Sequence, residues 1–427
     1  MQERAEAKIW YSLYGQLLCE KRLQAAFAKV RKAKGAPGID GQSTADFAKE
    51  EAHNLALLLR ELKEKSYRPL PVRRKVIPKP DGGERLLGIP AVRDRVVQQA
   101  LLDVLQPVFE PYFHPSSYAY RPGRSCHHAI AKVTSFVREH ELDWVVDLDL
   151  SKCFDTLDHD FIIKTFRKRI ADGSVLNLIN LFLKSGVMID GSWQASEIGS
   201  PQGGVISPLV ANVYLHEFDM EMMRRGHRIV RYADDILILK ASKPAAENAL
   251  KQARVILEDG LRLRVNEAKS AIRTAREGIP YLGVVIKTRS TSIKKSKIAA
   301  FKKRVKAITV RNSPVNLEQV IKDLEPLLRG FANYYKVANC QNLFRDLAMW
   351  IRRRLRAKQR KLWKKPTRMH RKLRQLGHVG GFKAMKMNSW RNSCSQPAHC
   401  AIPNRVFDEL GLFAIDSVKT GILPQPG

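Results

Sequence analysis

The sequence of 427 residues predicts an α+β protein with helical segments at both ends. From Val72 to Ile286, short apolar strands alternate with helices such as Val92 to Phe109. The segment from Arg4 to about Lys65 is rich in Ala, Leu, Glu and Lys, which favour helices. From Ile293 to Arg356, apolar residues recur at helical spacing over a length that fits three helices. With 44% apolar residues, the chain can bury a sizeable core.

The first strand pair of the α+β region is predicted to be a hairpin. Asp81-Gly82-Gly83 forms a turn between Val76-Ile77 and Leu86-Leu87. Lys79 and Arg85 then lie on either side of its tip as two projecting cations. Such a pair suits a triphosphate, and it also fits an ordinary solvated hairpin.

An acidic strand follows further along the chain. Trp144 to Leu150 alternates apolar and acidic residues, which places Asp147 and Asp149 on one face. Phe154 stands five residues after Asp149. Taken alone, Phe154 is a core residue at an apolar strand end.

A second hairpin places two adjacent carboxylates at its tip. Asp234 and Asp235 lie between the apolar runs Ile229-Val230 and Ile236 to Leu239. A tight turn ordinarily favours Asn-Gly or Asp-Gly, and two aspartates repel each other, so a counter-charge is expected. Mg²⁺ supplies one, because it binds to carboxylates and substrate phosphates. If the strands converge, Asp149 joins this pair as a ligand; otherwise the pair is a solvated surface turn.

Two further segments combine turn residues with basic or helical neighbours. Pro201-Gln202-Gly203-Gly204 precedes the helical segment Pro208 to Met223, and its glycines allow a close backbone approach to a substrate or simply form a loop. Lys269 follows Leu261 to Val265, which is predicted to be a basic strand. Lys269 is a general-acid candidate only if its pKa falls toward neutrality.

The net charge of +33 is concentrated in the C-terminal part. Seventeen Lys or Arg and no acidic residue lie between Leu347 and Phe407, and ten more basic residues lie in the acid-free stretch from Gly278 to Asn316. Such runs fit solvated faces or anionic-membrane anchors. Trp350, Trp363 and Trp390 interleave with them, however, which favours RNA or DNA as the partner.

No apolar stretch is long enough to span a bilayer, and Met1 to Glu20 lacks the pattern of a signal peptide. The six cysteines have no paired spacing, which fits a reducing compartment. We therefore expect a cytoplasmic protein that is not bound to a membrane.

Nine motifs in sequence order resemble those of the reverse transcriptases, most closely those encoded by bacterial group II introns. They are Gly35-Ala36-Pro37-Gly38-Ile39-Asp40-Gly41, Ile77-Pro78-Lys79-Pro80-Asp81-Gly82-Gly83, Leu87-Gly88-Ile89-Pro90, Tyr120-Arg121-Pro122-Gly123-Arg124, the Asp149 strand, Pro201-Gln202-Gly203-Gly204, Tyr232-Ala233-Asp234-Asp235, Asn266-Glu267-Ala268-Lys269-Ser270 and Tyr281-Leu282-Gly283.

The resemblance implies a right-hand polymerase whose fingers and palm contain an antiparallel sheet flanked by helices. It divides the chain into an N-terminal extension with the start of the fingers (1–65), fingers and palm (66–287), a helical thumb or maturase domain (288–363), and a small basic C-terminal DNA-binding module (364–427). The chain resembles the endonuclease-lacking members of the family, so no endonuclease module is expected.

The resemblance also implies roles for individual residues. Asp149, Asp234 and Asp235 would hold two Mg²⁺ ions, and Lys269 would protonate the leaving pyrophosphate. The residues implied to bind the incoming nucleotide are Lys79 and Arg85 at the triphosphate, Phe154 beneath the sugar, and Gln202, Gly203 and Tyr232 near the nascent base pair. Those implied to bind nucleic acid are Arg121, Arg124, Tyr281, Gly283, Arg352, Arg353, Arg354, Lys364 and Lys365.

The function that this resemblance implies is RNA-directed DNA synthesis from dNTPs on an RNA template and a DNA primer or target. A maturase role on an intron RNA accompanies it. Two alternatives stay open: a maturase whose polymerase activity is dispensable, and a domesticated relative that acts in DNA repair or phage defence.

Overall fold

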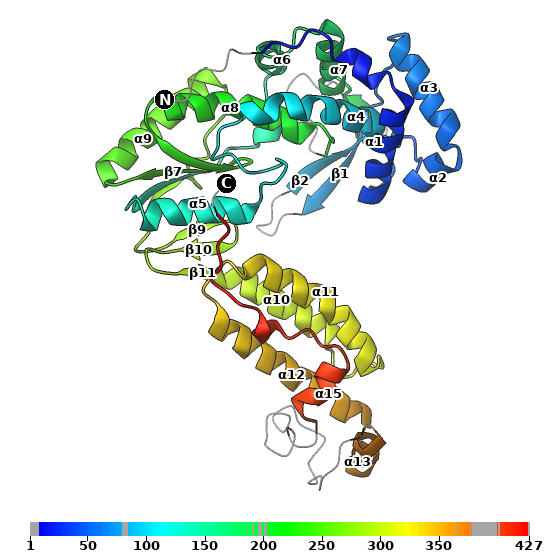
Figure 1. Ribbon diagram of the computed structural model, residues 1–427, viewed down its shortest axis with the longest axis vertical. Coiled ribbons are helices and arrows are strands. Elements are labelled where there is room, and N and C mark those ends of the chain that lie inside the picture. The colour runs from blue at the N-terminus through cyan, green and yellow to red at the C-terminus, as the bar shows by residue number, and fades with distance from the viewer. Residues whose placement is uncertain are drawn as a thin grey trace. The chain divides into compact units, whose positions relative to one another are not determined.

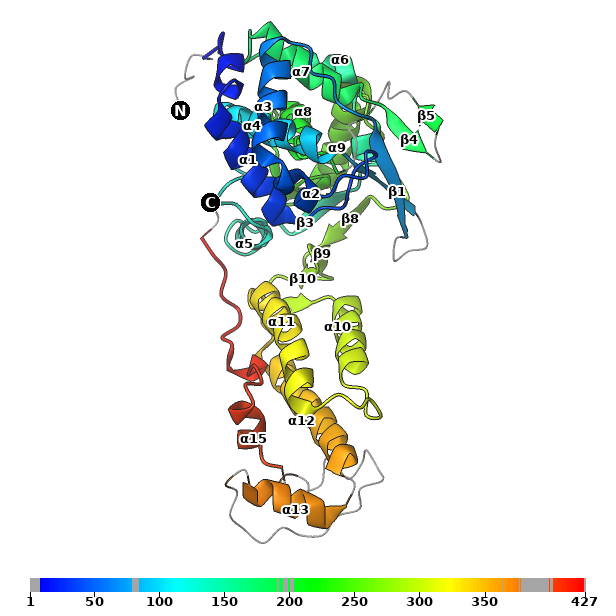
Figure 2. The same ribbon diagram turned by 90° about the vertical axis from the view of Figure 1, so that its right-hand side faces the viewer.

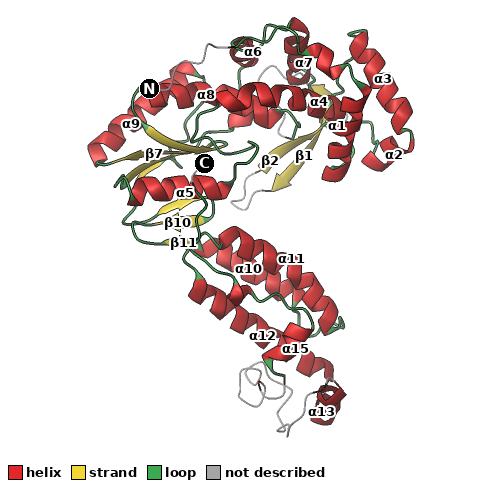
Figure 3. Cartoon of the chain, viewed as in Figure 1, coloured by secondary structure: helices red, strands yellow, loops and turns green. Residues whose placement is uncertain are grey.

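The computed structural model describes residues 8–78, 84–189, 192–194, 199, 203–363, 365–375, 377, 399 and 402–425. The chain forms two compact units (Figure 1). The first unit contains residues 1–132 and 141–273. The second unit contains residues 133–140 and 274–426. Helices and strands alternate in the first unit and helices dominate the second (Figure 3), which confirms the α+β prediction. None of the described helices is both long and apolar enough to cross a membrane.

The N-terminal part of the first unit is helical, as predicted. Its helices are α1 (Glu20–Ala33), α2 (Thr44–Lys49), α3 (Glu51–Lys63) and, after the first hairpin, α4 (Val92–Phe109). Helix α1 packs against α3 and α4 through an apolar face that includes Phe27, whose ring lies 4.7 Å from that of Phe47 in α2. Helix α2 begins with a capping box in which the Ser43 side chain accepts from the backbone of Asp46.

The first sheet has the strand order β2-β1-β4-β5. Its strands are β1 (Val72–Pro78), β2 (Glu84–Ile89), β4 (Val187–Ile189) and β5 (Ser192–Gln194). Strands β1 and β2 form the predicted antiparallel hairpin, and Ile77 pairs with Arg85. The turn residues 79–83 lie outside the described part of the chain.

The second sheet has the order β6-β7-β3-β8 and holds the acidic motifs. Its strands are β3 (Trp144–Leu148), β6 (Arg228–Tyr232), β7 (Asp235–Lys240) and β8 (Ala271–Thr274). Strand β7 pairs antiparallel with both β3 and β6. Helix α8 (Ser207–Arg224) packs against β6, and α9 (Lys243–Val255) packs against β3 and β7.

Three further α-helices lie between the strands in sequence. They are α5 (Cys126–Arg138), which continues into the second unit from residue 133, α6 (His159–Arg167) and α7 (Gly173–Leu183), and a short 3-10 turn lies at Cys153–Asp155. Helix α6 packs against α7 and α8. The predicted strand from Leu261 to Val265 is wrong. This segment follows a π-helical turn at Ile256–Gly260, and Val265 forms only an isolated bridge with Leu150.

The second unit contains a small antiparallel sheet in the order β11-β10-β9. Its strands are β9 (Ile279–Tyr281), β10 (Val284–Ile286) and β11 (Thr291–Ile293). Three helices follow, as predicted: α10 (Lys295–Ile308), α11 (Leu317–Tyr335) and α12 (Gln341–Trp363), seen side by side in Figure 2. They are followed by α13 (Pro366–Gln375) and α15 (Asn404–Glu409).

The C-terminal segment packs back along the helices of the second unit. Arg352 forms an ion pair with Asp416 at 2.9 Å, and Arg356 donates to the carbonyl of Ile402. The backbone N–H of Gly421 donates to the carbonyls of Lys336 and Ala338. Residues 402–425 therefore belong to the same compact unit as α11 and α12.

Candidate active site

The acidic hairpin consists of β6 and β7. Tyr232 pairs with Asp235, so Ala233 and Asp234 form the turn between the strands. Ala233 has a φ of 58°, a left-handed conformation that a two-residue hairpin turn demands and that glycine ordinarily supplies. The turn therefore keeps a strained alanine beside two carboxylates.

The end of β3 brings Asp149 to this hairpin. Leu148, the last residue of β3, pairs with Ile236, so Asp149 directly after it lies beside Asp235. Asn266 Nδ2 donates to Asp149 Oδ2 at 3.1 Å, and the Asp149 backbone N–H donates to Ser270 Oγ at 3.2 Å. Both partners come from the motif around Lys269, in which Asn266 orients the Asp149 carboxylate and Ser270 binds the Asp149 backbone.

The electrostatics of Asp235 indicate that the carboxylates converge. Loss of hydration raises its pKa to about 6, with further contributions from the negative charges of Asp234, Asp147 and Asp149. The Asp235 side chain remains open to solvent on one side, but protein atoms surround its carboxyl closely enough to disfavour the charged form. The arrangement concentrates negative charge at one end of the two central strands, β3 and β7.

The donor set fits a divalent cation that is completed by substrate. Within the described part of the chain, no three His, Cys, Asp or Glu side chains are grouped closely enough to bind one metal ion by themselves. Mg²⁺ commonly binds through one or two carboxylates together with phosphate oxygens and water, so a complete protein cage is not required. The hard oxygen donors of Asp149, Asp234 and Asp235 match that preference.

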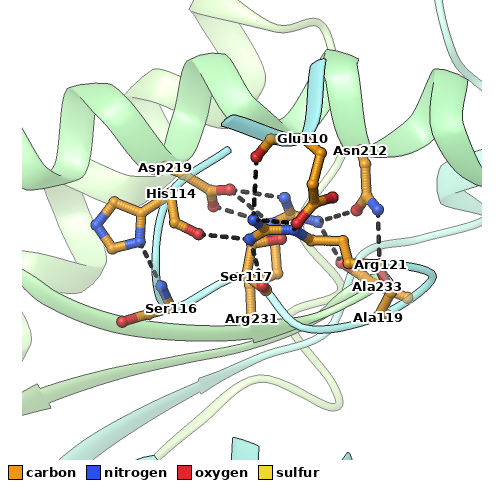
Figure 4. Close-up of polar contacts among 10 residues, drawn as sticks. All are labelled: Glu110, His114, Ser116, Ser117, Ala119, Arg121, Asn212, Asp219, Arg231 and Ala233. Carbon is orange, nitrogen blue, oxygen red and sulfur yellow. Dashed lines mark hydrogen bonds and ion pairs between the residues drawn. The ribbon is translucent and has the colours of Figure 1, made fainter. Parts of the chain in front are cut away.

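A buried ion pair lies between α8 and the strand that leads into the turn (Figure 4). Arg231 and Asp219 of α8 are both 0% exposed, and the guanidinium contacts both carboxylate oxygens at 2.6–3.0 Å. Arg231 Nη1 also donates to Asn212 Oδ1 at 3.0 Å and to the carbonyl of Ala233 at 3.2 Å. The ion pair thus reaches the turn residue that precedes the two aspartates.

Asp219 and Asn212 were not identified by sequence reasoning. The available signal was that Asp219 lies at helical spacing from the apolar residues Leu215 and Met222, which places it on the buried face of α8, where a carboxylate requires a partner.

The turn that carries Phe154 lies close to the carboxylates. Burial raises the pKa of the neighbouring Cys153 thiol to about 12, and the charge of Asp234 contributes. Phe154 is partly buried and packs against the main apolar core. Its predicted contact with the sugar stays a prediction.

The glycine motif has a packing constraint of its own. Gly203 has a φ of 115°, and a Cβ there would collide with the carbonyl oxygen of Gly88 in β2. The backbone N–H of Val205 donates to Gln98 at 2.7 Å. The absence of a side chain at Gly203 thus lets this loop approach β2 closely.

The other predicted nucleotide-binding residues are only partly described. Lys79 and Gln202 lie outside the described residues, and only the backbone of Arg85 is described. Lys269 is exposed in the turn after Asn266, and Tyr232 is half-buried at the end of β6.

Among the predicted nucleic-acid contacts, Arg121 and Tyr281 are buried. The Arg121 guanidinium binds Glu110 and the carbonyls of His114 and Ser117, so it organises its own loop (Figure 4). Tyr281 and Gly283 belong to the β9–β10 hairpin, which is anchored when Tyr334 donates to the carbonyl of Leu282 at 2.9 Å.

The predicted basic contacts fall into two groups. Arg124 donates to the carbonyl of Pro115 and Arg354 donates to Thr309, while Arg352 pairs with Asp416. Arg353 and Lys365 are exposed. Lys364 lies outside the described residues.

Family models and relatives match both parts of the chain. Residues 77–286 match the family "Reverse transcriptase (RNA-dependent DNA polymerase)", and residues 298–377 match "Group II intron, maturase-specific domain". Protein YkfC of Escherichia coli is 38% identical over 290 residues, which cover 59% of this chain and 76% of that protein. Group II intron-encoded protein LtrA of Lactococcus lactis is 28% identical over 434 residues, which cover 78% of this chain and 71% of that protein. Among solved structures, a partial Cas6-RT-Cas1–Cas2 complex matches with 21% identity and a TM-score of 0.37, covering 58% of this chain and 42% of that one.

Proposed function

The chain belongs to the reverse transcriptases and carries the maturase-specific domain of group II intron proteins, and from this premise we propose how its residues perform RNA-directed DNA synthesis. It is an RNA-directed DNA polymerase with a maturase role in intron splicing and mobility. Enzymes of this family use divalent metal ions, and their substrates are RNA and DNA.

The observation that supports the proposal is the convergence of carboxylates at one end of β3 and β7, the central strands of the second sheet. Asp149, Asp234 and Asp235 are the proposed ligands of two Mg²⁺ ions. When bound, such ions make the primer 3′-hydroxyl a better nucleophile and stabilise the leaving pyrophosphate. Asn266 holds the Asp149 carboxylate in place. Arg231 holds the turn before Asp234 and Asp235 by donating to the carbonyl of Ala233.

The incoming nucleotide is proposed to bind between the first hairpin and the turn at Cys153–Asp155. Lys79 and Arg85 bind the triphosphate, and Gln202, Gly203 and Tyr232 line the nascent base pair. The Phe154 ring then excludes a ribose 2′-hydroxyl and selects dNTPs. Lys269 is the proposed proton donor to the pyrophosphate.

The exposed cations of the second unit are proposed to bind the RNA template and the intron RNA. Arg353 and Lys365 are exposed there, and Trp350 lies beneath Arg354 and Lys302. Cations beside an aromatic ring can combine phosphate neutralisation with stacking.

Primer extension on an RNA template with Mg²⁺ tests the polymerase proposal. We expect the wild type to incorporate dNTPs and refuse rNTPs, Asp234→Asn to be inactive, and Phe154→Ala to gain rNTP incorporation. Equal use of both sugars by the wild type would contradict the role of Phe154. Full activity of Asp234→Asn would contradict the metal-ligand assignment.

Intron splicing by an Asp234→Ala variant separates the polymerase from the maturase. We expect splicing to persist while DNA synthesis is lost, because the substitution removes a carboxylate from the first unit, whereas the maturase-specific match lies in the second. Loss of both activities in a folded variant would mean that the maturase role needs the acidic site.

A further inference from the structure

Tyr120 has an unfavourable backbone conformation and an unfavourable exposure at the same time. Its φ is 60°, in the left-handed region that a bulky aromatic residue seldom adopts. The residue is also 55% exposed, so its ring contributes little to the core. Neither property favours folding. A strained residue that persists on a surface points to a function, provided that its surroundings hold it in place.

The surroundings do hold it, because both neighbours of Tyr120 are anchored (Figure 4). The carbonyl of Ala119 accepts a hydrogen bond from Asn212 Nδ2 at 2.8 Å. On the other side, the buried guanidinium of Arg121 binds Glu110 at 2.7 Å and the carbonyls of His114 and Ser117. These contacts fix the backbone on both sides of Tyr120 and leave its ring at the surface.

The same loop runs beside the strand that leads to the catalytic turn. The backbone N–H of Arg231 donates to Ser116, and Tyr118 donates to the carbonyl of Arg231 at 3.0 Å. Ser117 forms a parallel bridge with Arg231, which directly precedes Tyr232. Asn212, which binds the carbonyl of Ala119, also accepts from Arg231 Nη1, and this Nη1 donates to the carbonyl of Ala233. The loop that carries Tyr120 therefore lies beside the strand that leads into Ala233-Asp234-Asp235.

We propose that Tyr120 is a nucleic-acid-binding residue, whose ring packs against a base or sugar of the strand that passes the catalytic turn. The Arg121 and Asn212 contacts are positioning contacts that hold the ring toward this strand. An aromatic face binds nucleotides without sequence preference, as a template-directed polymerase requires. The proposal rests on the assignment of Asp234 and Asp235 to the catalytic site.

The strained φ of Tyr120 separates a binding role from a structural role. If the ring binds nucleic acid, replacing it with Gly should weaken binding without lowering the unfolding temperature, whereas a structural role would lower the unfolding temperature. Glycine adopts a φ of 60° without a steric cost, so Tyr120→Gly should unfold at the same temperature as the wild type or higher. The same variant should bind an RNA template–DNA primer duplex about tenfold more weakly, because one stacking contact is lost. Tyr120→Phe keeps the ring and should bind like the wild type.

The experiment combines thermal unfolding with fluorescence anisotropy on a labelled duplex, at a salt concentration that suppresses phosphate contacts. Glu141→Gly is the matched control, because Glu141 is also exposed with a positive φ of 54°. It should gain stability in the same way and leave the Kd unchanged. Tyr120→Ala, which removes the ring and keeps Cβ, should match the weakened binding of Tyr120→Gly.

Three results would overturn the proposal: a Kd for Tyr120→Gly equal to that of the wild type, an unfolding temperature that falls with the affinity, or a Tyr120→Phe variant as weak as Tyr120→Gly. Titration of the single-stranded RNA template assigns the contact. Weakening with both ligands places it on the template strand, and weakening with the duplex alone places it at the primer end.

Failure of the catalytic assignment is recognised separately. Asp234→Asn should bind the duplex and not extend it. If this variant extends primers normally, the assignment of Asp234 fails, whereas the binding difference between Tyr120→Gly and Tyr120→Phe can still be read.

Discussion

At Asp235, loss of hydration and the negative charges of neighbouring carboxylates both raise the pKa of the carboxyl group. The result is a carboxyl whose pKa is raised from 3.8 to about 6. A carboxyl with a raised pKa in the folded state binds its proton more tightly there than in the unfolded chain. Ionising Asp235 therefore lowers the folding stability of the metal-free protein.

This sign predicts the pH dependence of stability in the metal-free protein. As the pH rises from 3.8 through about 6, the wild type should lose stability relative to Asp235→Asn, which has no charge to ionise. Thermal unfolding in EDTA at about pH 4.5, near the lower pKa value, and at about pH 7.5, above the upper one, measures the difference. We expect Asp235→Asn to be the more stable variant at the higher pH. An equal difference at both pH values would contradict this account.

The buried pair of Arg231 and Asp219 predicts a separation of stability from activity. Arg231→Met leaves Asp219 buried and unpaired, which should cost about 3–5 kcal/mol of unfolding free energy. The double variant Arg231→Met with Asp219→Leu removes both charges and should recover much of that loss. Chemical denaturation measures both values.

Activity in the double variant should nevertheless stay low. Arg231 Nη1 donates to the carbonyl of Ala233, and no side chain introduced by the double variant can replace that donor. Primer extension per folded molecule measures the effect. Full recovery of extension together with stability would show that the Ala233 contact does not position the catalytic turn.

At the scale of elements, the loop at Gly203 depends on a close approach between two backbones. Gly203→Ala should destabilise the protein by about 1–3 kcal/mol, because it adds a Cβ collision with Gly88 to the cost of a positive φ. Gly226→Ala is the matched control, since Gly226 also has a positive φ but has open space around it. Urea unfolding of both variants isolates the collision, and equal losses would contradict it.

The spacing of apolar residues in the sequence predicted the helices that bury one face. Helix α4 spans Val92–Phe109, as expected, and the three helices of the second unit appear where apolar residues recur at helical spacing. The segment from Leu261 to Val265 was mispredicted for an instructive reason. Its residues do alternate between buried and exposed, but Arg262 has a positive φ of 55° and the segment makes only one isolated bridge. Alternating burial indicates a strand only where a neighbouring strand is free to pair.

The candidate site was predictable where neighbours in sequence form it and unpredictable where distant segments meet. The turn residues Asp234 and Asp235 follow from a local pattern. Arg231 in β6 forms an ion pair with Asp219 in α8. Arg121 was predicted to bind nucleic acid, and its guanidinium forms an ion pair with Glu110 within the protein. Sequence shows that a cation is present but not which anion or carbonyl it faces.

Across the whole molecule, the charge of +33 overstates the number of cations available to nucleic acid. In α12, Arg356 and Lys358 are buried and donate to protein carbonyls, and Arg352 pairs with Asp416. Helix α10 differs, because Lys302, Lys303 and Arg304 are all exposed. Its cations are therefore the better candidates for phosphate contacts.

The salt dependence of RNA binding tests whether affinity depends on the position of the cations in α10 or only on the net charge of the protein. Replacing Lys302, Lys303 and Arg304 with Ala should reduce the slope of log K against log salt by about 2, since each phosphate contact with single-stranded RNA contributes roughly 0.7. A second triple variant, with Ala at Arg31, Lys32 and Lys34, removes the same charge from the exposed end of α1. Filter binding over a range of salt concentrations should leave the slope of this control near that of the wild type. If both variants lower the slope equally, RNA responds to net charge alone and α10 has no specific role; if only the α10 variant does, phosphates lie along this helix.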